Sequence, residues 1–220
     1  MKCVKLHTNK QDVPVGKILC LGRNYAEHAK EMKSEIPTTP VVFLKPSTAL
    51  INNGEPIVLP RISNDVHQEV ELVVVIGNNG KNISSTNALD HVLGYGIGLD
   101  MTLRDVQGEA KKKGLPWSVA KGFDTSAPVS EIIARDKIAN IQDVVIRCSV
   151  NGALRQQTST SKMIFSVAKI IEYVSTIFTL ERGDVIFTGT PEGVGQVKSG
   201  DVIEAELQGY IKITHPVISL

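Results

Sequence analysis

The amino-acid sequence predicts a β-rich α+β fold with few helices. Short runs rich in β-branched residues alternate with turn residues along most of the 220-residue chain, which is typical of strands. Strongly helical periodicity is confined to residues 163–177. Strand and helix segments do not alternate as βαβ units would, so a Rossmann or TIM-barrel fold is disfavoured. Because no linker divides the chain, we expect one domain over residues 1–220.

The expected strands lie between the turn residues. Pairs such as Asn-Gly, Arg-Gly and Ser-Gly separate the apolar runs. Among them, Asn151-Gly152 stands between two strand-like runs and is typical of a tight β-hairpin. The strands that we expect cover residues 17–21, 41–44, 69–76, 144–150, 184–188 and 201–207.

Three helices are expected. Apolar residues in 163–177 recur at helical spacing, with Thr and Ser just before them to cap the start. A polar helix is expected near residues 102–113, ending at Gly114. A short helix is expected over residues 26–33. We expect the three lysines at 111–113 to face solvent.

Composition and charge exclude several classes of protein. The 24 Lys and Arg residues balance 23 Asp and Glu residues, so no nucleic-acid partner is expected. No apolar run approaches the roughly 20 residues of a membrane span, so we expect no membrane partner. The three cysteines have neither a disulfide-framework nor a zinc-site spacing. With no signal peptide visible, we expect a cytoplasmic protein, or an organellar one if a transit peptide is missing from this sequence.

Two glutamates stand at the start of an otherwise apolar strand. Glu69 and Glu71 are two residues apart, so their side chains point to the same face. Adjacent carboxylates beside apolar residues repel each other unless a cation compensates them. The alternative is a solvated face of an amphipathic strand. Because this face continues with Val73 and Val75, the pattern favours a cation-binding pair.

A third carboxylate, Asp100, follows a strand-like segment in which glycines occupy alternate positions from 94 to 98. Glycines on one face of a strand often allow something to approach the backbone closely. The alternative role for Asp100 is to cap the next helix. Oxygen ligands from Glu69, Glu71 and Asp100 suit a hard cation, Mg²⁺ or Mn²⁺, that keeps open positions for water or substrate.

His28 and Glu31 are three residues apart in a segment expected to be helical, so their side chains would meet. A carboxylate that orients a neutral imidazole makes a general base able to activate water near neutral pH. The alternative for this spacing is an ordinary surface contact. Because the segment follows a strand, it could close over a site as a lid.

Two further features could contribute to a site. The Gly-rich loop at residues 187–195 lacks the Walker A and GxGxxG patterns. Its N–H groups could hold a carboxylate or an oxyanion, and a plain turn region is the alternative. Lys45 and Lys121 each end an apolar stretch, so either one could serve as a semi-buried cation.

These residues lie in motifs through which the chain resembles the fumarylacetoacetate hydrolase family. The first three motifs are Gly-Arg-Asn-Tyr at 22–25, Phe-Leu-Lys-Pro at 43–46 and His-Gln-Glu-Val-Glu at 67–71. The other four are Leu-Asp-Met-Thr-Leu-Arg-Asp-Val-Gln at 99–107, Gly-Leu-Pro-Trp at 114–117, Ala-Lys-Gly-Phe-Asp at 120–124 and Thr-Gly-Thr-Pro-Glu-Gly-Val-Gly at 188–195. The resemblance extends over about residues 17–210 and is strongest to the short acylpyruvate hydrolase and oxaloacetate decarboxylase branch. It implies the mixed β-sheet sandwich or roll of the fumarylacetoacetase C-terminal domain, and a homodimer.

The resemblance also implies roles for single residues. It implies that Mg²⁺ or Mn²⁺ is held by Glu69, Glu71 and Asp100. It implies catalytic roles for His28, Glu31 and Lys121, with the first two activating water on a lid. It implies that the substrate's carboxylate and oxo groups are bound by Arg23, Arg104, Gln107 and Thr190.

The activity that this resemblance implies is cation-dependent C–C bond cleavage in a small 2-oxo acid. Acylpyruvates would be hydrolysed to pyruvate and a carboxylate. Because oxaloacetate decarboxylation gives the same enolate without water, one site can support both reactions. The alternatives are a 2-hydroxyhepta-2,4-diene-1,7-dioate isomerase or 5-oxopent-3-ene-1,2,5-tricarboxylate decarboxylase activity, an oxaloacetate tautomerase, and a catalytically idle protein that binds 2-oxo acids.

Overall fold

The computed structural model describes residues 1–219, and its larger sheet mixes parallel and antiparallel pairs. Its strands are β3 (Ile18–Gly22), β4 (Val41–Lys45), β5 (Leu50–Asn52), β8 (Val70–Ile76), β9 (Val92–Leu99), β11 (Ala127–Val129), β12 (Ile133–Ala134) and β15 (Val185–Phe187). The strand order is β4-β3-β15-β8-β9-β11-β5, with β12 paired to β9. The pairs β15–β3 and β11–β5 are parallel, whereas β8 and β9 are antiparallel.

A second sheet faces the first. Its strands, in the order β14-β13-β17-β18-β6, are β14 (Ala153–Ser159), β13 (Val145–Val150), β17 (Val202–Leu207), β18 (Ile211–Ser219) and β6 (Ile57–Leu59). The predicted hairpin is confirmed, because Val150 pairs with Ala153 across Asn151 and Gly152. Both turn residues have positive φ, 52° and 77°, as the tight hairpin turn requires.

Two smaller sheets complete the strands. One joins β1 (Cys3–Lys5) to β2 (Asp12–Pro14). The other places β7 (Val66–Gln68) between β10 (Thr102–Leu103) and β16 (Gly195–Gln196). All six strands predicted from the sequence are present, with each end shifted by at most one residue.

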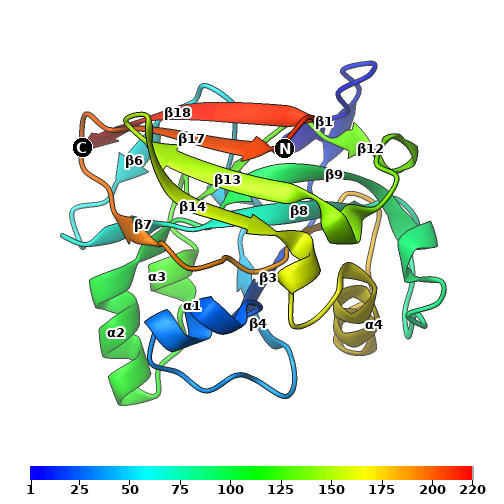
Figure 1. The fold of residues 1–220 in the computed structure, drawn as a ribbon, viewed down its shortest axis with the longest axis horizontal. Helices are drawn as coiled ribbons and strands as arrows, with labels where there is room; N and C mark the ends of the chain where they lie inside the picture. The colour runs from blue at the N-terminus through cyan, green and yellow to red at the C-terminus, as the bar shows by residue number, and fades with distance from the viewer. Residues whose placement is uncertain (220) are drawn as a thin grey trace.

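The main core lies between the two large sheets. In Figure 1, β13, β14, β17 and β18 lie above and in front of β8 and β9, with the helices below. Leu72 and Val74 of β8 share one apolar cluster with Ile146 of β13. Val73 and Val75, on the other face of β8, belong to a second buried cluster. Because both faces of β8 are buried, the alternative of a solvated face for its glutamates is wrong.

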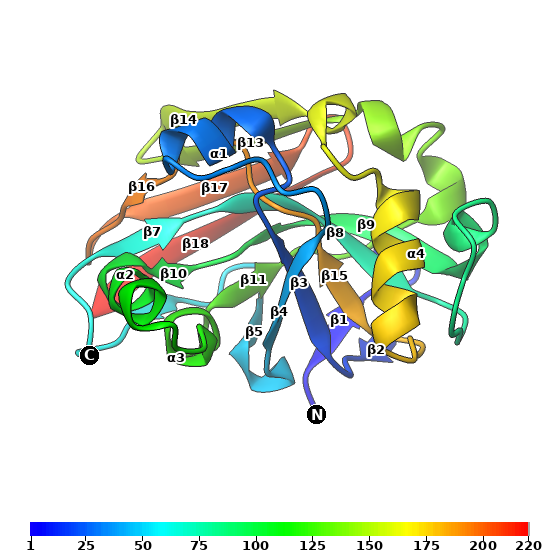
Figure 2. The same cartoon turned by 90° about the horizontal axis from the view of Figure 1, so that it is seen from below.

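The α-helices are α1 (Ala26–Glu31), α2 (Arg104–Lys113), α3 (Ser118–Lys121) and α4 (Val167–Ile177), and they lie around β3 and β4 when the molecule is seen from below (Figure 2). Short 3₁₀ turns occur at η1 (Ser47–Ala49), η2 (Ala88–His91), η3 (Arg135–Lys137), η4 (Ile141–Asp143) and η5 (Thr160–Lys162). Within residues 1–219, no helix has the length and apolarity needed to cross a membrane. All three cysteines are free.

Two helix starts differ from the sequence prediction. The periodic segment was expected to be helical from residue 163, but α4 begins after Ser166, whose hydroxyl accepts the N–H of Lys169. The polar helix starts at Arg104 rather than 102, because Thr102 and Leu103 pair with β7. Its predicted end is confirmed by Gly114, which has a left-handed φ of 64°. The four-residue α3 was not predicted, since it is too short to show periodicity.

Candidate active site

The three predicted metal-binding carboxylates meet where β8 and β9 run side by side. Glu71 pairs in register with Gly98, and the N–H of Asp100 donates to the carbonyl of Glu69 at 2.8 Å. One carboxylate oxygen of each acidic residue lies within 4.8 Å of the others. All three side chains are buried. The antiparallel pairing therefore brings together residues that lie about thirty positions apart in the chain.

The glycines of β9 make room for the protein itself rather than for a ligand. A Cβ on Gly94 would overlap the carbonyl oxygen of Ile133, and one on Gly96 would lie 2.6 Å from the Ser130 hydroxyl. The segment that approaches the bare face of β9 is thus the one that carries β11 and β12. The alternative role of Asp100 as a helix cap is wrong, because α2 has no side-chain cap.

Both candidate lysines, not one of them, lie against the acidic triad. The Nζ of Lys121 is 2.7 Å from Glu69 Oε2 and 2.7 Å from Asp100 Oδ2. The Nζ of Lys45 is 2.8 Å from Asp100 Oδ1. Arg104 contacts the other oxygen of Glu69 and donates to Gln107 Oε1 at 2.8 Å. These basic groups neutralise Glu69 and Asp100 inside the protein.

The electrostatic environment differs among the acidic groups. Burial by itself raises the pKa of Glu69, but the charges of Lys121 and Arg104 outweigh burial and hold this pKa below its ordinary value. Burial, with repulsion from Asp100 and Glu69, raises the pKa of Glu71 well above its ordinary value. Burial lowers the pKa of Lys121, yet Asp100 and Glu69 outweigh it and this pKa is raised.

The triad fits a hard divalent cation. Among residues 1–219, no basic group contacts the Glu71 carboxylate, whose Oε2 accepts the N–H of Gly189 at 2.6 Å. A buried carboxylate without a basic partner, beside two others, is stabilised by a positive ion. Carboxylate oxygens are the ligands that Mg²⁺ and Mn²⁺ prefer. Glu69, Glu71 and Asp100 are therefore the residues that could hold the cation.

The predicted dyad forms on α1. The Nδ1 of His28 is 3.1 Å from Glu31 Oε2, and His28 is buried. Glu31 Oε1 accepts the N–H of Gly193 at 3.0 Å, which connects α1 to the Gly-rich loop. Because a carboxylate only accepts hydrogen bonds, Nδ1 carries the proton and the lone pair of the neutral ring remains on Nε2.

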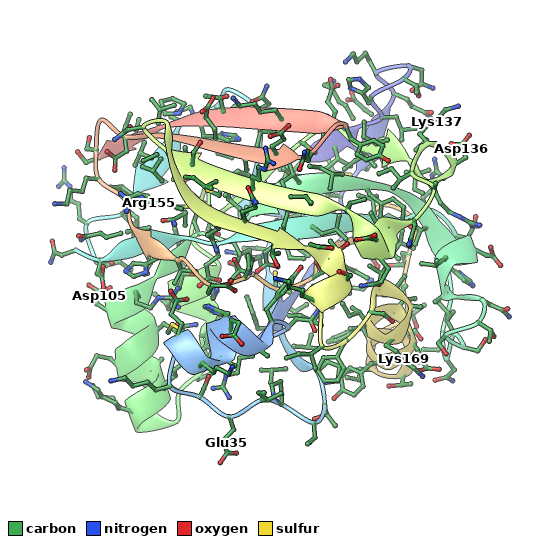
Figure 3. All side chains as sticks on the ribbon, viewed as in Figure 1. Glu35, Asp105, Asp136, Lys137, Arg155 and Lys169 are labelled. Atoms are coloured by element: carbon green, nitrogen blue, oxygen red, sulfur yellow. The ribbon has the colours of Figure 1, made fainter. Side chains whose placement is uncertain are left out.

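One pocket contains most of the predicted site. It is lined by Leu21, Gly22, Arg23, His28, Met32, Phe43, Glu69, Glu71, Arg104, Gln107, Lys111, Trp117, Lys121 and Thr190. Glu31 and Asp100 do not line it: the exposed Glu31 contacts His28, and the buried Asp100 contacts Lys45 and Lys121. In Figure 3, the labelled Glu35, Asp136 and Lys137 lie at the periphery of the molecule, whereas Glu69, Glu71, Asp100 and Lys121 are buried.

The sequence analysis missed Gln156, a buried residue of β14. Its Nε2 donates to Thr190 Oγ1 at 2.9 Å, and its Oε1 accepts the N–H of Val70 at 3.0 Å. Thr190 Oγ1 donates in turn to the carbonyl of Val70 at 2.9 Å. Gln156 and Thr190 thus fix the residue between Glu69 and Glu71. No local pattern could reveal Gln156, because it reaches the site from the second sheet.

The expectation that the three lysines at 111–113 face solvent is confirmed, since all three are exposed, but Lys111 lies at a different place from the other two. Lys112 and Lys113 extend along the outer side of α2 and contact Glu109 at 2.9 and 3.8 Å. Lys111 instead lines the pocket, and its Nζ lies 5.1 Å from the ring centroid of Trp117. The helical rotation between successive residues separates one lysine of the run from the other two.

The site combines a buried acidic triad that fits a divalent cation with a histidine dyad, and both lie beside one pocket at the β-sheet. These features define a cation-dependent enzyme. The chain belongs to the fumarylacetoacetate hydrolase family, since residues 17–218 match the family model described as fumarylacetoacetate (FAA) hydrolase C-terminal. It is 50% identical over 200 residues to oxaloacetate tautomerase FAHD1, mitochondrial, of Bos taurus, covering 91% of this chain and 90% of that protein.

Two further proteins extend the comparison. The chain is 50% identical over 194 residues to oxaloacetate decarboxylase, mitochondrial, of Dictyostelium discoideum, covering 88% of this chain and 89% of the relative. Its structure is similar to the crystal structure of fumarylpyruvate hydrolase from Pseudomonas aeruginosa in complex with Mn²⁺ and pyruvate, with a TM-score of 0.96 and 35% identity. That likeness covers 99% of this chain and 96% of the other. The predicted β-rich fold and family are confirmed.

Proposed function

We propose that the protein is a divalent-cation-dependent enzyme that cleaves a C–C bond in small 2-oxo acids. It hydrolyses acylpyruvates to pyruvate and a carboxylate, and it decarboxylates oxaloacetate at the same site. The single observation that carries this proposal is that His28 and the buried triad line or adjoin one pocket. The names of the relatives, and the Mn²⁺ and pyruvate in the similar structure, support it.

Each group of the pocket has a separate task. When held by Glu69, Glu71 and Asp100, Mg²⁺ or Mn²⁺ supplies a Lewis acid for the carboxylate and 2-oxo oxygens of the substrate. Arg104 donates to Gln107 Oε1, so the amide N–H₂ of Gln107 is left to bind the substrate. Arg104, Gln107 and the neighbouring ammonium of Lys121 orient the carboxylate and oxo groups. Arg23 and Thr190 complete the binding residues.

His28 distinguishes hydrolysis from decarboxylation. Its Nε2 accepts a proton from water as that water attacks the distal carbonyl of an acylpyruvate. The C–C bond then breaks, its electron pair forms the pyruvate enolate, and the Lys121 ammonium stabilises the developing charge. Loss of CO₂ from oxaloacetate gives the same enolate and needs no water. Protonation of that enolate carbon completes either reaction.

Acetylpyruvate and oxaloacetate test the proposal directly. Purified protein with Mg²⁺ should release pyruvate from both, and no turnover of either would contradict the proposal. Glu71→Gln should abolish Mg²⁺ binding by calorimetry and turnover, while the circular dichroism spectrum stays native. His28→Ala should reduce acetylpyruvate hydrolysis by about 10²- to 10⁴-fold and decarboxylation much less. Equal losses for the two reactions would contradict the role of His28 in activating water.

Oxaloacetate tautomerisation is the second candidate function. It is supported by the name of the Bos taurus relative, an oxaloacetate tautomerase that is 50% identical to this chain. Moving a proton between carbon and oxygen uses the same enolate, so the same pocket can support it. Spectroscopic measurement of enol and keto forms, before any pyruvate appears, distinguishes it from decarboxylation. Analysis of the products likewise separates the isomerase alternative, and cation and oxalate binding without turnover would indicate an idle binding protein.

We propose that the protein is a homodimer. A groove beside the pocket is lined by residues 40–44 and 115–118 with Tyr173, Ile177 and Phe178. It includes β4, the end strand of the large sheet, and Leu44, Leu115 and Ile177 there are 44%, 55% and 50% exposed. Exposed apolar groups on an end strand are suited to cover by a second copy. Sedimentation equilibrium should give a dimer mass, and Leu44→Lys should favour the monomer.

The cellular location stays a proposal. We propose the cytoplasm, with an organelle as the alternative suggested by the names of the mitochondrial relatives. The free cysteines fit a reducing compartment. Fluorescence microscopy of the tagged full-length protein in its own cells would distinguish the two.

A further inference from the structure

The ammonium of Lys121 has a hydrogen-bond acceptor for each of its three N–H bonds. Its Nζ lies 2.7 Å from Glu69 Oε2, 2.7 Å from Asp100 Oδ2 and 2.6 Å from Thr102 Oγ1. An ammonium has three donors and no acceptor, so these contacts use all of its donors. Two of the acceptors belong to residues that could hold the cation, and the third does not. Thr102 is therefore a partner of Lys121 from outside the acidic triad.

The hydroxyl of Thr102 is oriented to accept from Lys121. Thr102 is fully buried in β10, where it pairs with His67 of β7. Its Oγ1 donates its own proton to the carbonyl of Asp100 at 3.1 Å. The lone pairs of this oxygen are thus left for the ammonium. Because a β-branched side chain is stiff at χ1, the oxygen keeps this position.

A cation in the triad would compete with Lys121 for its charged acceptors but not for Thr102. A divalent ion and the ammonium both bind the carboxylate oxygens of Glu69 and Asp100, and their positive charges repel each other. The hydroxyl of Thr102 carries no charge, so its bond to Lys121 is retained. The ring of Phe43, whose centroid lies 5.0 Å from Nζ, is a second neutral neighbour at the wall of the pocket. These neutral contacts would keep the ammonium beside the pocket while its other N–H bonds turn to a ligand.

We infer that Thr102 is a positioning residue, which holds the Lys121 ammonium where its N–H bonds meet the negative charge that develops on the enolate oxygen. The inference rests on the proposed function, which assigns this stabilisation to Lys121. Thr102 acts through Lys121, because Lys121 lines the pocket and Thr102 does not. Its loss should slow hydrolysis and decarboxylation alike, since both reactions form the same enolate. Loss of His28, in contrast, should slow chiefly hydrolysis.

Two unreactive ligands test this role without turnover. Oxalate carries a negative oxygen where pyruvate has a neutral 2-oxo oxygen, so it resembles the pyruvate enolate. Calorimetry with saturating Mg²⁺ should show that Thr102→Val, which replaces the hydroxyl with a methyl group, weakens oxalate binding about tenfold or more, because a displaced ammonium no longer meets the added charge. Pyruvate binding should change less than about threefold. Thr102→Ser, which keeps the hydroxyl, should restore the affinity for oxalate.

Kinetics and a double-mutant cycle test the same role through Lys121. In Thr102→Val, kcat should fall about 10- to 100-fold for both oxaloacetate decarboxylation and acetylpyruvate hydrolysis, with little change in KM. Mg²⁺ titration of each variant sets the saturating concentration. In Lys121→Met, which has no ammonium to position, adding Thr102→Val should cause no further loss of oxalate affinity.

Thr160→Val is the matched control for the loss of a buried hydroxyl. Thr160 of η5 is also fully buried, and its Oγ1 donates to the carbonyl of Ile141 at 2.8 Å and accepts the N–H of Val144 at 3.0 Å. Thr160→Val should therefore lower stability in urea, as Thr102→Val does, yet leave oxalate affinity and kcat unchanged. If Thr102→Val does not fold, Thr102→Ala takes its place with the same expected pattern.

Three outcomes would overturn the inference. Thr102→Val would weaken oxalate and pyruvate equally, or it would behave like Thr160→Val, or its effect would be the same with and without the Lys121 ammonium. The proposed function fails in a different way. If no 2-oxo acid is turned over but Thr102→Val still weakens oxalate selectively, the proposed reaction is wrong and the positioning role stands. If turnover occurs and Thr102→Val leaves it unchanged, only the role of Thr102 is wrong.

Discussion

Replacing Lys45 with Met removes one charge from the interior while keeping most of the side-chain volume. The Nζ of Lys45 is fully buried and lies 2.8 Å from Asp100 Oδ1. It also donates to the carbonyl of Lys121 and, at 3.2 Å, to the carbonyl of Met101. In Lys45→Met, an oxygen of Asp100 and two backbone carbonyls would stay buried without this donor. The substitution therefore measures how much the ammonium contributes to stability before any cation binds.

The geometry sets the expected magnitude. Removing one partner of a buried ion pair costs about 3–5 kcal/mol, because the other charge stays buried and unpaired. Lys121 still contacts the second oxygen of Asp100 at 2.7 Å, so we expect the lower part of this range. At roughly 2–4 °C per kcal/mol for a chain of this size, a loss of about 3 kcal/mol lowers Tm by about 6–12 °C.

Urea denaturation of the metal-free protein, followed by circular dichroism, measures the change. Lys112→Met is the matched control, because this exposed lysine contacts only Glu109 and its replacement should leave stability nearly unchanged. In a double-mutant cycle, Asp100→Asn should remove much of the cost of Lys45→Met. A loss below about 1 kcal/mol, or strictly additive effects in the cycle, would refute the reasoning, since the cost of leaving a buried charge unpaired would then not apply to this pair.

Further predictions concern stability and pH. Gly94→Ala should destabilise the fold by about 3 kcal/mol or more, because the added Cβ would overlap a backbone carbonyl of β12. Gly108→Ala in α2 is the control: its Cβ would enter open space, so the substitution should stabilise the fold by up to about 1 kcal/mol. Burial lowers the pKa of His215 below 6.5, so the unfolded chain binds more protons below that pH. The free energy of unfolding should therefore decrease as the pH drops below about 6.5. His215→Gln should reduce this dependence of the free energy on pH, as measured by urea titrations. Gln156→Leu should cost about 1–3 kcal/mol and weaken Mg²⁺ binding, because the N–H of Val70 loses its acceptor; unchanged calorimetry would contradict this.

The sequence alone determined the features that depend on local spacing. The two-residue period of a strand placed Glu69 and Glu71 on one face, and the three-residue spacing of His28 and Glu31 placed them in contact on α1. Turn residues located every predicted strand to within one residue. Such features follow from backbone periodicity, which is the same wherever the segment lies in the fold.

Only the tertiary structure decided which groups surround those residues. Both lysines, rather than one, meet the carboxylates, and Gln156 arrives from the second sheet to fix the strand between them. Lys111 turns out to line the pocket because the rotation of α2 is set by what its buried side packs against. These contacts join segments far apart in the chain, so their geometry depends on how the sheets and helices assemble and not on any local pattern.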